Sequence, residues 1–248
     1  MKASSNPVAY TQGGFLGGTL SPEDTIEPLL ASATASFGVT ALNELQRLYN
    51  QRSLYEDGEF ALEVMKYMND RVEEFSRQDG RSYNVYGTPA EKLCGLQAKQ
   101  FREKYGIIRN VSDRAYFSNS FHCHVSEDID QIQKQESESR FWNYFNGGKI
   151  QYVRINGDEL KNPEGIRGIV ENAMRLGLYE GINLSLAYCN RCGWDSHYVQ
   201  HMESCPKCGS EDLIKIERMC GFLSYTRMNG KSRLNDAKMA EIKDRRSM

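Results

Sequence analysis

Two closely spaced cysteine pairs constrain this chain more than any other feature. In the segment CNRCGWDSHYVQHMESCPKCG, Cys189 and Cys192 are separated by two residues, and Cys205 and Cys208 repeat that spacing. Two intervening residues let both thiolates of a pair face one ion, and two such turns complete a tetrahedral shell. Zinc is the expected ion, with iron in the same four-sulfur geometry as the alternative. Four thiolates leave no open coordination position, so the ion is expected to be structural.

Glycines and histidines accompany these cysteines. Gly193 and Gly209 each follow a pair, at a position where such a turn often requires a positive φ. His197 and His201 lie between the pairs, and either could replace a cysteine as a ligand, although four sulfurs are already available. The remaining alternative is four unconnected thiols.

The composition is that of an ordinary soluble globular protein. A chain of 248 residues is long enough to bury a core. Its residues are 40% hydrophobic and 26% charged, which is the usual balance for such a protein. The net charge of −2 gives no bulk positive field to attract nucleic acid. No apolar run could span a bilayer, and the opening MKASSNPVAYTQGG lacks the apolar centre of a secretory signal. The expected location is the cytoplasm, where seven cysteines indicate metal or redox work rather than disulfides.

Helix-like and strand-like segments alternate along the chain. The clearest helix is 58–75, whose apolar residues recur with the three-and-four spacing of one face. The other expected helices are 40–50, 89–105 and 164–179. The expected strands are the beginning of 5–20, then 82–87, 114–125, 149–155 and 181–189. This alternation predicts an α/β fold with largely parallel strands. The charged segment 126–140 is expected to be a solvated loop or a surface helix.

A second candidate site lies where the helix 89–105 begins. Thr88 fits the N-cap, Pro89 the first helical position and Glu91 the third, which together make a capping box. The simplest interpretation is a well-started helix. The functional interpretation is that exposed N–H groups of the first turn, around Ala90, bind an anion such as a phosphate. Glu91 would then have to point aside or compete with the phosphate for those donors.

The segment SNSFHCHV carries two histidines. On a strand, His122 and His124 would share one face, opposite Cys123. A metal pair is conceivable, but hydrogen-bonded histidines lining a cleft are the favoured interpretation. Asn119 and Ser120 could hydrogen-bond a polar ligand in that cleft.

A glycine interrupts an otherwise strand-like run near the end of the sequence. In ERMCGFLSYTRMNG, Gly221 lies between Cys220 and Phe222. Such a glycine usually marks a bulge or a close approach of the backbone. The alternative is chemical: a glycine that loses its α-hydrogen carries a radical stabilised by the neighbouring amide and carbonyl, and that radical can pass to a thiol. Composition alone leaves both interpretations open.

The order of these motifs resembles the oxygen-sensitive, class III (anaerobic) ribonucleoside-triphosphate reductases, a family of glycyl radical enzymes. The matching segments cover essentially the whole chain: TASFGVTALNELQRLYN, YGTPAEKLCGLQAKQFREKYG, YFSNSFHCHVSEDI, GGKIQYVRI, INLSLAYCNRCG, CPKCG and ERMCGFLSYTRMNGKSRLNDAKMAEIKDR. The resemblance implies a ten-stranded α/β barrel in which a glycine loop and a cysteine loop meet. It also implies the reduction of ribonucleotides to 2′-deoxyribonucleotides for DNA synthesis.

The resemblance further implies roles for individual residues. Gly221 would carry a radical made by a separate radical-SAM activase with an iron–sulfur cluster. A transient cysteinyl radical then takes the ribose 3′-hydrogen, and the 2′-hydroxyl leaves as water. A structural zinc ion that braces the radical loop would be bound by Cys189, Cys192, Cys205 and Cys208. The residues implied to contact the substrate are Thr88, Pro89, Ala90, Glu91, Asn119 and His122.

Chains of this family are far longer. Their nucleotide-sensing N-terminal domain, the front half of the barrel and the cysteine loop precede everything seen here. We therefore expect a C-terminal part that is inactive without an upstream half, with the assembled enzyme a homodimer by resemblance only. Its expected divisions are a barrel portion 1–186, a zinc module 187–212, and the radical loop with its tail 213–248. The loop reads CGFLSY, where the family has a small residue or asparagine before the glycine and GYLGY-like residues after it.

Two other functions remain open at this stage. One is a zinc ribbon that binds nucleic acid or another protein through nearby cations, namely Arg191, Lys207 and Lys215. The other is a radical-bearing replacement for the C-terminus of a full-length enzyme that oxygen has cleaved.

Overall fold

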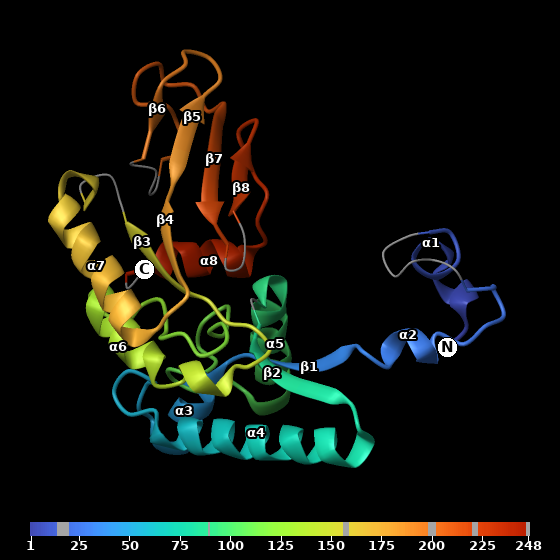
Figure 1. The fold of residues 1–248 in the computed structure, drawn as a ribbon. Helices are drawn as coiled ribbons and strands as arrows, with labels where there is room; N and C mark the ends of the chain where they lie inside the picture. Colours follow the sequence, from blue (N-terminus) through green and yellow to red (C-terminus); the bar gives the residue numbers. More distant parts are fainter. Residues whose placement is uncertain (14–19, 89, 156–158, 198–201, 220–222, 247–248) are drawn as a thin grey trace.

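The computed structural model describes residues 1–13, 20–88, 90–155, 159–197, 202–219 and 223–246, which form a mixed α/β chain (Figure 1). The helices are α1 (Pro7–Tyr10), α2 (Glu27–Leu30), α3 (Leu42–Asn50), α4 (Glu59–Asp79), α5 (Glu91–Tyr105), α6 (Gln131–Ser139), α7 (Pro163–Leu176) and α8 (Asp236–Asp244). The strands are β1 (Thr34–Val39), β2 (Ser82–Gly87), β3 (Gln151–Ile155), β4 (Glu180–Leu184), β5 (Leu186–Cys189), β6 (Asp195–Ser196), β7 (Leu213–Arg218), β8 (Leu223–Met228) and β9 (Lys231–Ser232). Short 3-10 helices cover Ala3–Ser5, Trp142–Tyr144 and Glu159–Lys161.

The strands form three sheets. β1 pairs with β2 and β3 pairs with β4, both in parallel, which confirms the predicted α/β layout for this part of the chain. The helices α3 and α4 connect the first pair and α7 connects the second, as parallel strands require. The third sheet, β6-β5-β7-β8-β9, is antiparallel, so the prediction of largely parallel strands is wrong there. Because the described strands form three separate sheets, the ten-stranded barrel stays a prediction.

The main apolar core lies between α4, the β1–β2 sheet and the loop before α6. Ala61, Met65 and Val72 of α4 are buried, as the spacing of that helix predicted. They pack with Val85 of β2 and with aromatic side chains that include Phe121. This core fixes the segment around residue 120 against the end of β2, where the second candidate site lies.

Three segments differ from the expectations. Residues 114–125 contain no strand, because the chain turns there: the N–H of His122 donates to the carbonyl of Asn119 over 3.1 Å, and Ser120 has a φ of 48°. Residues 7–10 are the helix α1 rather than a strand, since the side chain of Asn6 caps it. Helix α6 occupies part of 126–140 and buries Lys134 and Glu138, so this charged segment is not merely solvated.

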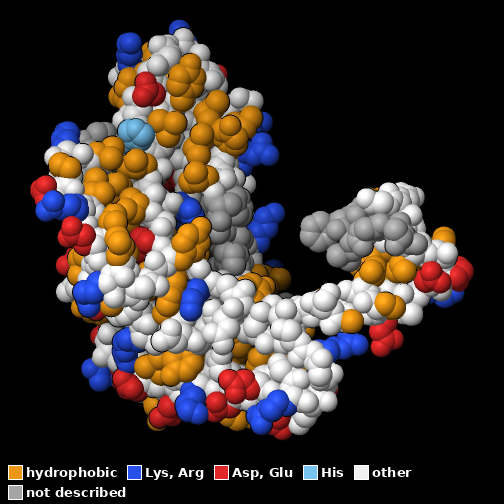
Figure 2. All heavy atoms as spheres, viewed as in Figure 1, with side chains coloured by type: hydrophobic (Ala, Val, Ile, Leu, Met, Phe, Trp, Pro, Cys, Tyr) orange, Lys and Arg blue, Asp and Glu red, His pale blue; other side chains and the backbone are white. Residues whose placement is uncertain are grey.

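The described residues among the first thirty or so form an arm that projects from the body and joins it through β1 (Figures 1 and 2). Within the described ranges, none of the helices combines the length and the apolar character needed to cross a membrane.

Candidate functional site

The four paired cysteines converge at one end of the antiparallel sheet. One potential ligand atom from each of Cys189, Cys192, Cys205 and Cys208 lies within 4.8 Å of all the others. The Sγ atoms of Cys189 and Cys208 are 3.7 Å apart, as are those of Cys192 and Cys205. Four sulfurs bound tetrahedrally to one zinc ion at about 2.3 Å would lie about 3.8 Å from one another. The cluster therefore has the geometry of a closed four-thiolate site.

The backbone of each cysteine pair forms the expected turn. The N–H of Gly193 donates to the carbonyl of Cys189 over 3.0 Å, and the N–H of Gly209 donates to that of Cys205 over 2.8 Å. These glycines have φ values of 68° and 71°, which confirms the predicted need for a positive φ. Although the backbone N–H of Ser210 lowers it, burial and the neighbouring thiols raise the pKa of Cys208 to about 12. Thiols packed this closely ionise together only when a cation neutralises them.

The sheet connects this four-cysteine cluster to the segment that contains Gly221. Cys189 ends β5 opposite Leu213, the first residue of β7, and β7 pairs with β8 from Lys215 to Arg218. Gly221 itself, with Cys220 and Phe222, lies outside the described residues. His197 hydrogen-bonds to the carbonyl of Ser185 over 2.9 Å instead of joining the sulfur cluster. His201, the other alternative ligand, also lies outside the described residues.

The hairpin formed by β7 and β8 is held by a buried charged network from α8. Arg245 donates to the carbonyl of Arg218 over 3.2 Å and to that of Met219 over 3.0 Å, immediately before Cys220. Arg245 also donates to Glu241, which accepts from Lys238 over 2.8 Å. Burial would raise the pKa of Glu241, but these two cations outweigh burial and lower it. The backbone on the N-terminal side of Gly221 is therefore fixed by a side chain that cannot easily move.

The start of α5 is organised by a side chain from a distant loop. Asn119 Oδ1 accepts from the N–H of Ala90 over 3.1 Å and from the Sγ of Cys94 over 3.4 Å. With its oxygen engaged twice, Asn119 has only its amide NH₂ group left for a ligand. The predicted contribution of Asn119 to a polar site beside the helix start is consistent with this arrangement.

The predicted capping box is wrong. Helix α5 begins at Glu91 with Ala90 as its N-cap, and no side chain of that residue caps the helix. Thr88 Oγ1 is instead buried, with no hydrogen-bond partner among the described residues, and so is Ser120 Oγ. A Cβ on Gly38 would lie 1.9 Å from Thr88 Oγ1, so only glycine allows this close approach. These two buried hydroxyls thus lie in the segments 88–90 and 119–120, which the hydrogen bond from the N–H of Ala90 to Asn119 holds together. Pro89 lies outside the described residues.

His122 is fixed by a buried carboxylate on α6. Its Nδ1 lies 2.9 Å from Glu138 Oε2, while Lys134 Nζ is 2.9 Å from Glu138 Oε1. Burial alone would raise the pKa of Glu138, but Lys134 and His122 outweigh burial and lower it to about 2. Glu138 Oε1 also accepts from the N–H of Cys123 over 3.0 Å. The ring of His122 is therefore held so that Nε2 is the nitrogen available to a ligand.

His124 points to different partners, so the prediction that it shares a face with His122 is wrong. Its Nδ1 is 2.7 Å from Arg114 Nη1 and 2.9 Å from Ser126 Oγ. Burial, together with the charges of Arg114 and Arg47, lowers the pKa of His124 to about 3. The histidines are nevertheless hydrogen-bonded, as the favoured interpretation held.

The buried state of His124 makes stability sensitive to acid. Below pH 6.5 the unfolded chain takes up a proton on this ring that the folded chain takes up only near pH 3. We therefore expect the unfolding free energy to fall with decreasing pH, with a slope from this group of up to about 1.4 kcal/mol per pH unit. Urea denaturation between pH 7 and 5, in excess zinc, should show a shallower slope for His124→Gln than for the wild type. The exposed His197→Gln is the matched control, and a slope unchanged by His124→Gln would contradict this account.

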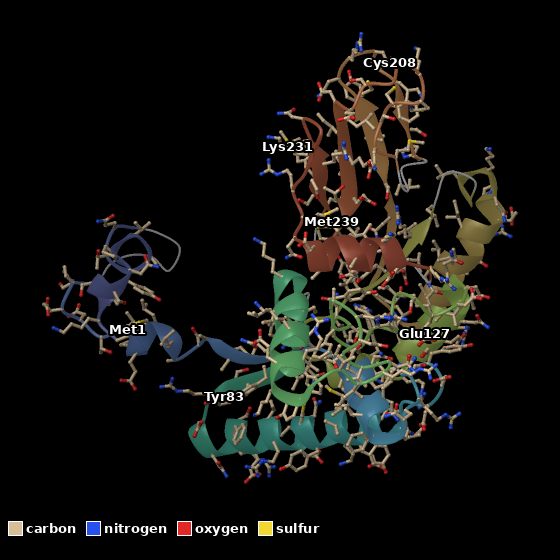
Figure 3. The ribbon with its side chains drawn as sticks, turned by 180° about the vertical axis from the view of Figure 1, so that it is seen from behind. Met1, Tyr83, Glu127, Cys208, Lys231 and Met239 are labelled. Carbon is tan, nitrogen blue, oxygen red and sulfur yellow. The ribbon has the colours of Figure 1, made fainter. Side chains whose placement is uncertain are left out.

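Tyr152 of β3 links the histidine side of the site to the hairpin. The centroid of its ring lies 4.8 Å from that of His122, and the guanidinium carbon of Arg218 lies 5.7 Å from the same ring. Arg218 also donates to Asn183 of β4 over 3.1 Å. The β7–β8 hairpin thus reaches the β3–β4 sheet at a point that also contacts His122. In Figure 3, Cys208 marks the opposite end of the antiparallel sheet.

Several residues that shape this site were missed from the sequence. Glu138 and Lys134 are four apart on α6, but a charged (i, i+4) pair usually indicates an exposed helix face. Arg245 lies in the charged tail and contacts residues about 27 positions earlier in the chain. Tyr152 belongs to a correctly predicted strand, and nothing in its local sequence distinguishes it.

Comparisons with known proteins agree on one family. The family model described as anaerobic ribonucleoside-triphosphate reductase matches residues 1–247. The enzyme of that name from Enterobacteria phage T4 is 30% identical over 238 residues, which are 93% of this chain and 38% of the relative. The enzyme of that name from Escherichia coli (strain K12) is 24% identical over 234 residues, covering 90% of this chain and 33% of the relative. This chain therefore spans little more than a third of the curated relatives it matches.

Solved structures give the same result for the fold. A structure named anaerobic ribonucleotide reductase aligns with a TM-score of 0.64 and 20% identity, over 86% of this chain and 34% of that chain. The anaerobic ribonucleotide reductase from Thermotoga maritima, solved with MES in its active site, aligns with a TM-score of 0.61 and 20% identity, over 77% of this chain and 32% of that chain. At this level of identity, the likeness concerns the fold alone.

Proposed function

Because this chain belongs to the anaerobic ribonucleoside-triphosphate reductase family, we propose that it is the C-terminal part of such a reductase and carries the radical glycine at Gly221. In this proposal a radical-SAM activase generates the glycyl radical, which takes the hydrogen atom of a cysteine thiol; the resulting thiyl radical starts the reaction, and a separate reductant supplies the electrons for ribonucleotide reduction. The divisions 1–186, 187–212 and 213–248 remain part of the proposal, as does dimerisation of the assembled enzyme.

One observation supports this proposal above the others. The β7–β8 hairpin, whose connection contains Gly221, is anchored by Arg245 on the side that faces Tyr152 and His122. A radical glycine needs a rigid backbone that excludes water, and the two carbonyls held by Arg245 belong to the residues just before Cys220. The four-cysteine site lies at the other end of β7, where Cys189 of β5 is paired with Leu213. A zinc ion bound there would hold β5 and β7 in register and so stabilise the loop that contains Gly221.

The start of α5 is the proposed binding site for a substrate phosphate. The first N–H groups of a helix have no partners within the helix and carry partial positive charge. Here Thr88 and Ser120 add hydroxyls that have no partner among the described residues, and Asn119 adds its amide NH₂ group. His122 Nε2, fixed through Glu138, would face the remainder of the substrate. Ala90 contributes through its backbone N–H group, and Glu91, whose side chain lies outside the described part of the structure, would have to point aside or compete with the phosphate.

The exposed apolar surface supports an enzyme that is incomplete without its upstream part. Tyr188, Tyr225 and Leu223 lie on the antiparallel sheet and are 43%, 49% and 57% exposed. Figure 2 shows hydrophobic side chains gathered over this sheet. The two-stranded sheets β1–β2 and β3–β4 also leave strand edges unpaired among the described residues. Such edges and patches are normally covered by further strands or by a partner surface.

The proposal is tested by generating the radical. The chain is combined under anaerobic conditions with the upstream part of the reductase and a radical-SAM activase, and electron paramagnetic resonance is recorded. We expect a doublet from the single α-hydrogen of the Gly221 radical, and exposure to air should then release residues 222–248. Gly221→Ala should give neither the doublet nor the fragment.

Gly168→Ala is the matched control, since a Cβ there on α7 meets nothing within 4 Å. A doublet that persists in Gly221→Ala would refute the assignment of the radical. If the doublet forms only when this chain is added to an oxygen-cleaved full-length enzyme, the chain is a replacement C-terminus. Salt-dependent binding of DNA or RNA that is lost on charge reversal of Arg191 and Lys207 would favour the ribbon module instead.

A further inference from the structure

A cavity of about 370 Å³ lies between the antiparallel sheet and α8, away from the histidine site. Its upper wall comes from β7, β8 and β9, and its lower wall from α8 and the residues before it. The full lining is Met202, Glu203, Lys215, Glu217, Thr226, Arg227, Ser232, Leu234, Met239, Ile242 and Lys243. Figure 3 shows Met239 on α8 at the base of this sheet, below Lys231. The volume is that of a small organic ligand.

Cations gather on the sheet side of this cavity. Lys215 lies directly opposite Arg227 in the β7–β8 ladder, and Arg227 lies opposite Ser232 of β9, so these side chains share one face. Like charges opposite one another destabilise a sheet unless something compensates them. Burial and the charge of Arg227 lower the pKa of Lys215, while Glu217 and Glu203 raise it. Lys215 and Arg227 therefore lie side by side on this wall, and both would attract an anion bound in the cavity.

Neither carboxylate of the cavity forms an ion pair with Arg227 or Lys243 in the part of the chain that the structure describes. Glu217 is 3.2 Å from Arg154 and accepts from Thr226 over 2.9 Å, so it is already engaged. Glu203 is exposed and forms no ion pair within the described ranges. Arg227 Nε is buried without a hydrogen-bond partner in the part of the chain that the structure describes. A buried charged donor without a partner is unfavourable, so its environment suits an anionic ligand.

The opposite wall is apolar. Leu234, Met239 and Ile242 line it, and Lys243 adds a further cation at the rim. We propose that this cavity binds an organic anion, in which a carboxylate or phosphate group lies between Arg227 and Lys243 and an apolar body lies against Met239 and Ile242. This site is separate from the proposed phosphate site at α5 and does not depend on the proposed reductase function.

Titration calorimetry on the 248-residue chain tests the proposal at fixed ionic strength, because surface charge effects are screened by salt. The probes are hexanoate, phenyl phosphate, inorganic phosphate and the neutral 1-hexanol. Saturable binding is expected for at least one of the two amphipathic anions, and about tenfold weaker binding for inorganic phosphate and 1-hexanol. Whichever of hexanoate and phenyl phosphate binds more tightly identifies the preferred anionic group as a carboxylate or a phosphate. Binding of neither amphipathic anion, or equal binding of 1-hexanol, would overturn the proposal.

Variants locate the site. Arg227→Gln should weaken the tighter probe at least about tenfold, as expected for the loss of a charged hydrogen bond. Lys243 is exposed, so the Lys243→Gln variant should fold normally. It tests the contribution of the second cation to binding if Arg227→Gln is unstable. Met239→Ser should weaken the amphipathic anions but not inorganic phosphate. Lys231→Gln, an exposed cation of β9 outside the cavity lining, is the control. Binding unaffected by both cation variants, or weakened equally by Lys231→Gln, would refute the site.

Discussion

Replacing Cys205 with serine is expected to cost the chain about 5 kcal/mol or more of unfolding free energy in the presence of zinc, and to abolish zinc binding at the proposed four-cysteine site. Cys205 is 1% exposed and its Sγ lies 3.7 Å from that of Cys192 within the four-sulfur cluster. In small structural sites, about 10 kcal/mol or more of zinc-binding free energy contributes directly to folding. A hydroxyl in place of one thiolate opens the shell and removes much of that contribution. Metal analysis and urea denaturation of the purified protein measure both effects.

The controls separate loss of metal from loss of packing. Ser204→Ala changes the exposed neighbour of Cys205 and should retain one equivalent of zinc and the wild-type midpoint. A strong chelator added to the wild type should reproduce the Cys205→Ser midpoint. Hydrogen exchange should then quicken first along β5 and β7, because Cys189 and Leu213 are paired beside the cluster. A Cys205→Ser chain that keeps its zinc and its midpoint would contradict a structural metal site.

Local spacing made the four-cysteine cluster predictable. Each cysteine pair with its glycine closes a turn within five residues, so nothing from elsewhere in the chain is needed to shape it. The apolar face of α4 was predictable for the same reason, since its three-and-four period is a local property. The resemblance of the motif order then indicated the family, which the match over residues 1–247 confirmed.

The parts that failed depend on contacts between distant segments. The capping box at Thr88 is absent because Asn119, about thirty residues later, takes the N–H of Ala90. The strand formers of 114–125 do not form a strand because the buried Phe121 and the bond from Cys123 to Glu138 favour a turn. Propensity is a weak prior that tertiary contacts override in such places. These two corrections both occur where the site is built, and functional sites are where local rules are most often broken.

Glu138→Gln is expected to destabilise the chain by about 3 kcal/mol and to free the ring of His122. The carboxylate is fully buried and compensates the buried Lys134, so a neutral amide leaves that cation without its counter-charge. Breaking one partner of a buried ion pair typically costs about 3–5 kcal/mol. Glu136→Gln is the matched control on the same helix, because its ion pair with Arg175 is exposed and should contribute less than about 1 kcal/mol.

The interpretation of Glu138 can be tested beyond stability. Adding Lys134→Met to Glu138→Gln should recover much of the lost free energy, since the uncompensated charge is then gone. The His122 ring should nevertheless remain free in the double variant, because its acceptor is still an amide. Nitrogen chemical shifts of that imidazole should show a fixed Nδ1–H tautomer in the wild type and in Glu136→Gln, and a mixture in both Glu138→Gln chains. Full additivity of the two substitutions would show that Lys134 does not depend on Glu138. A fixed tautomer in Glu138→Gln would show that another group orients His122.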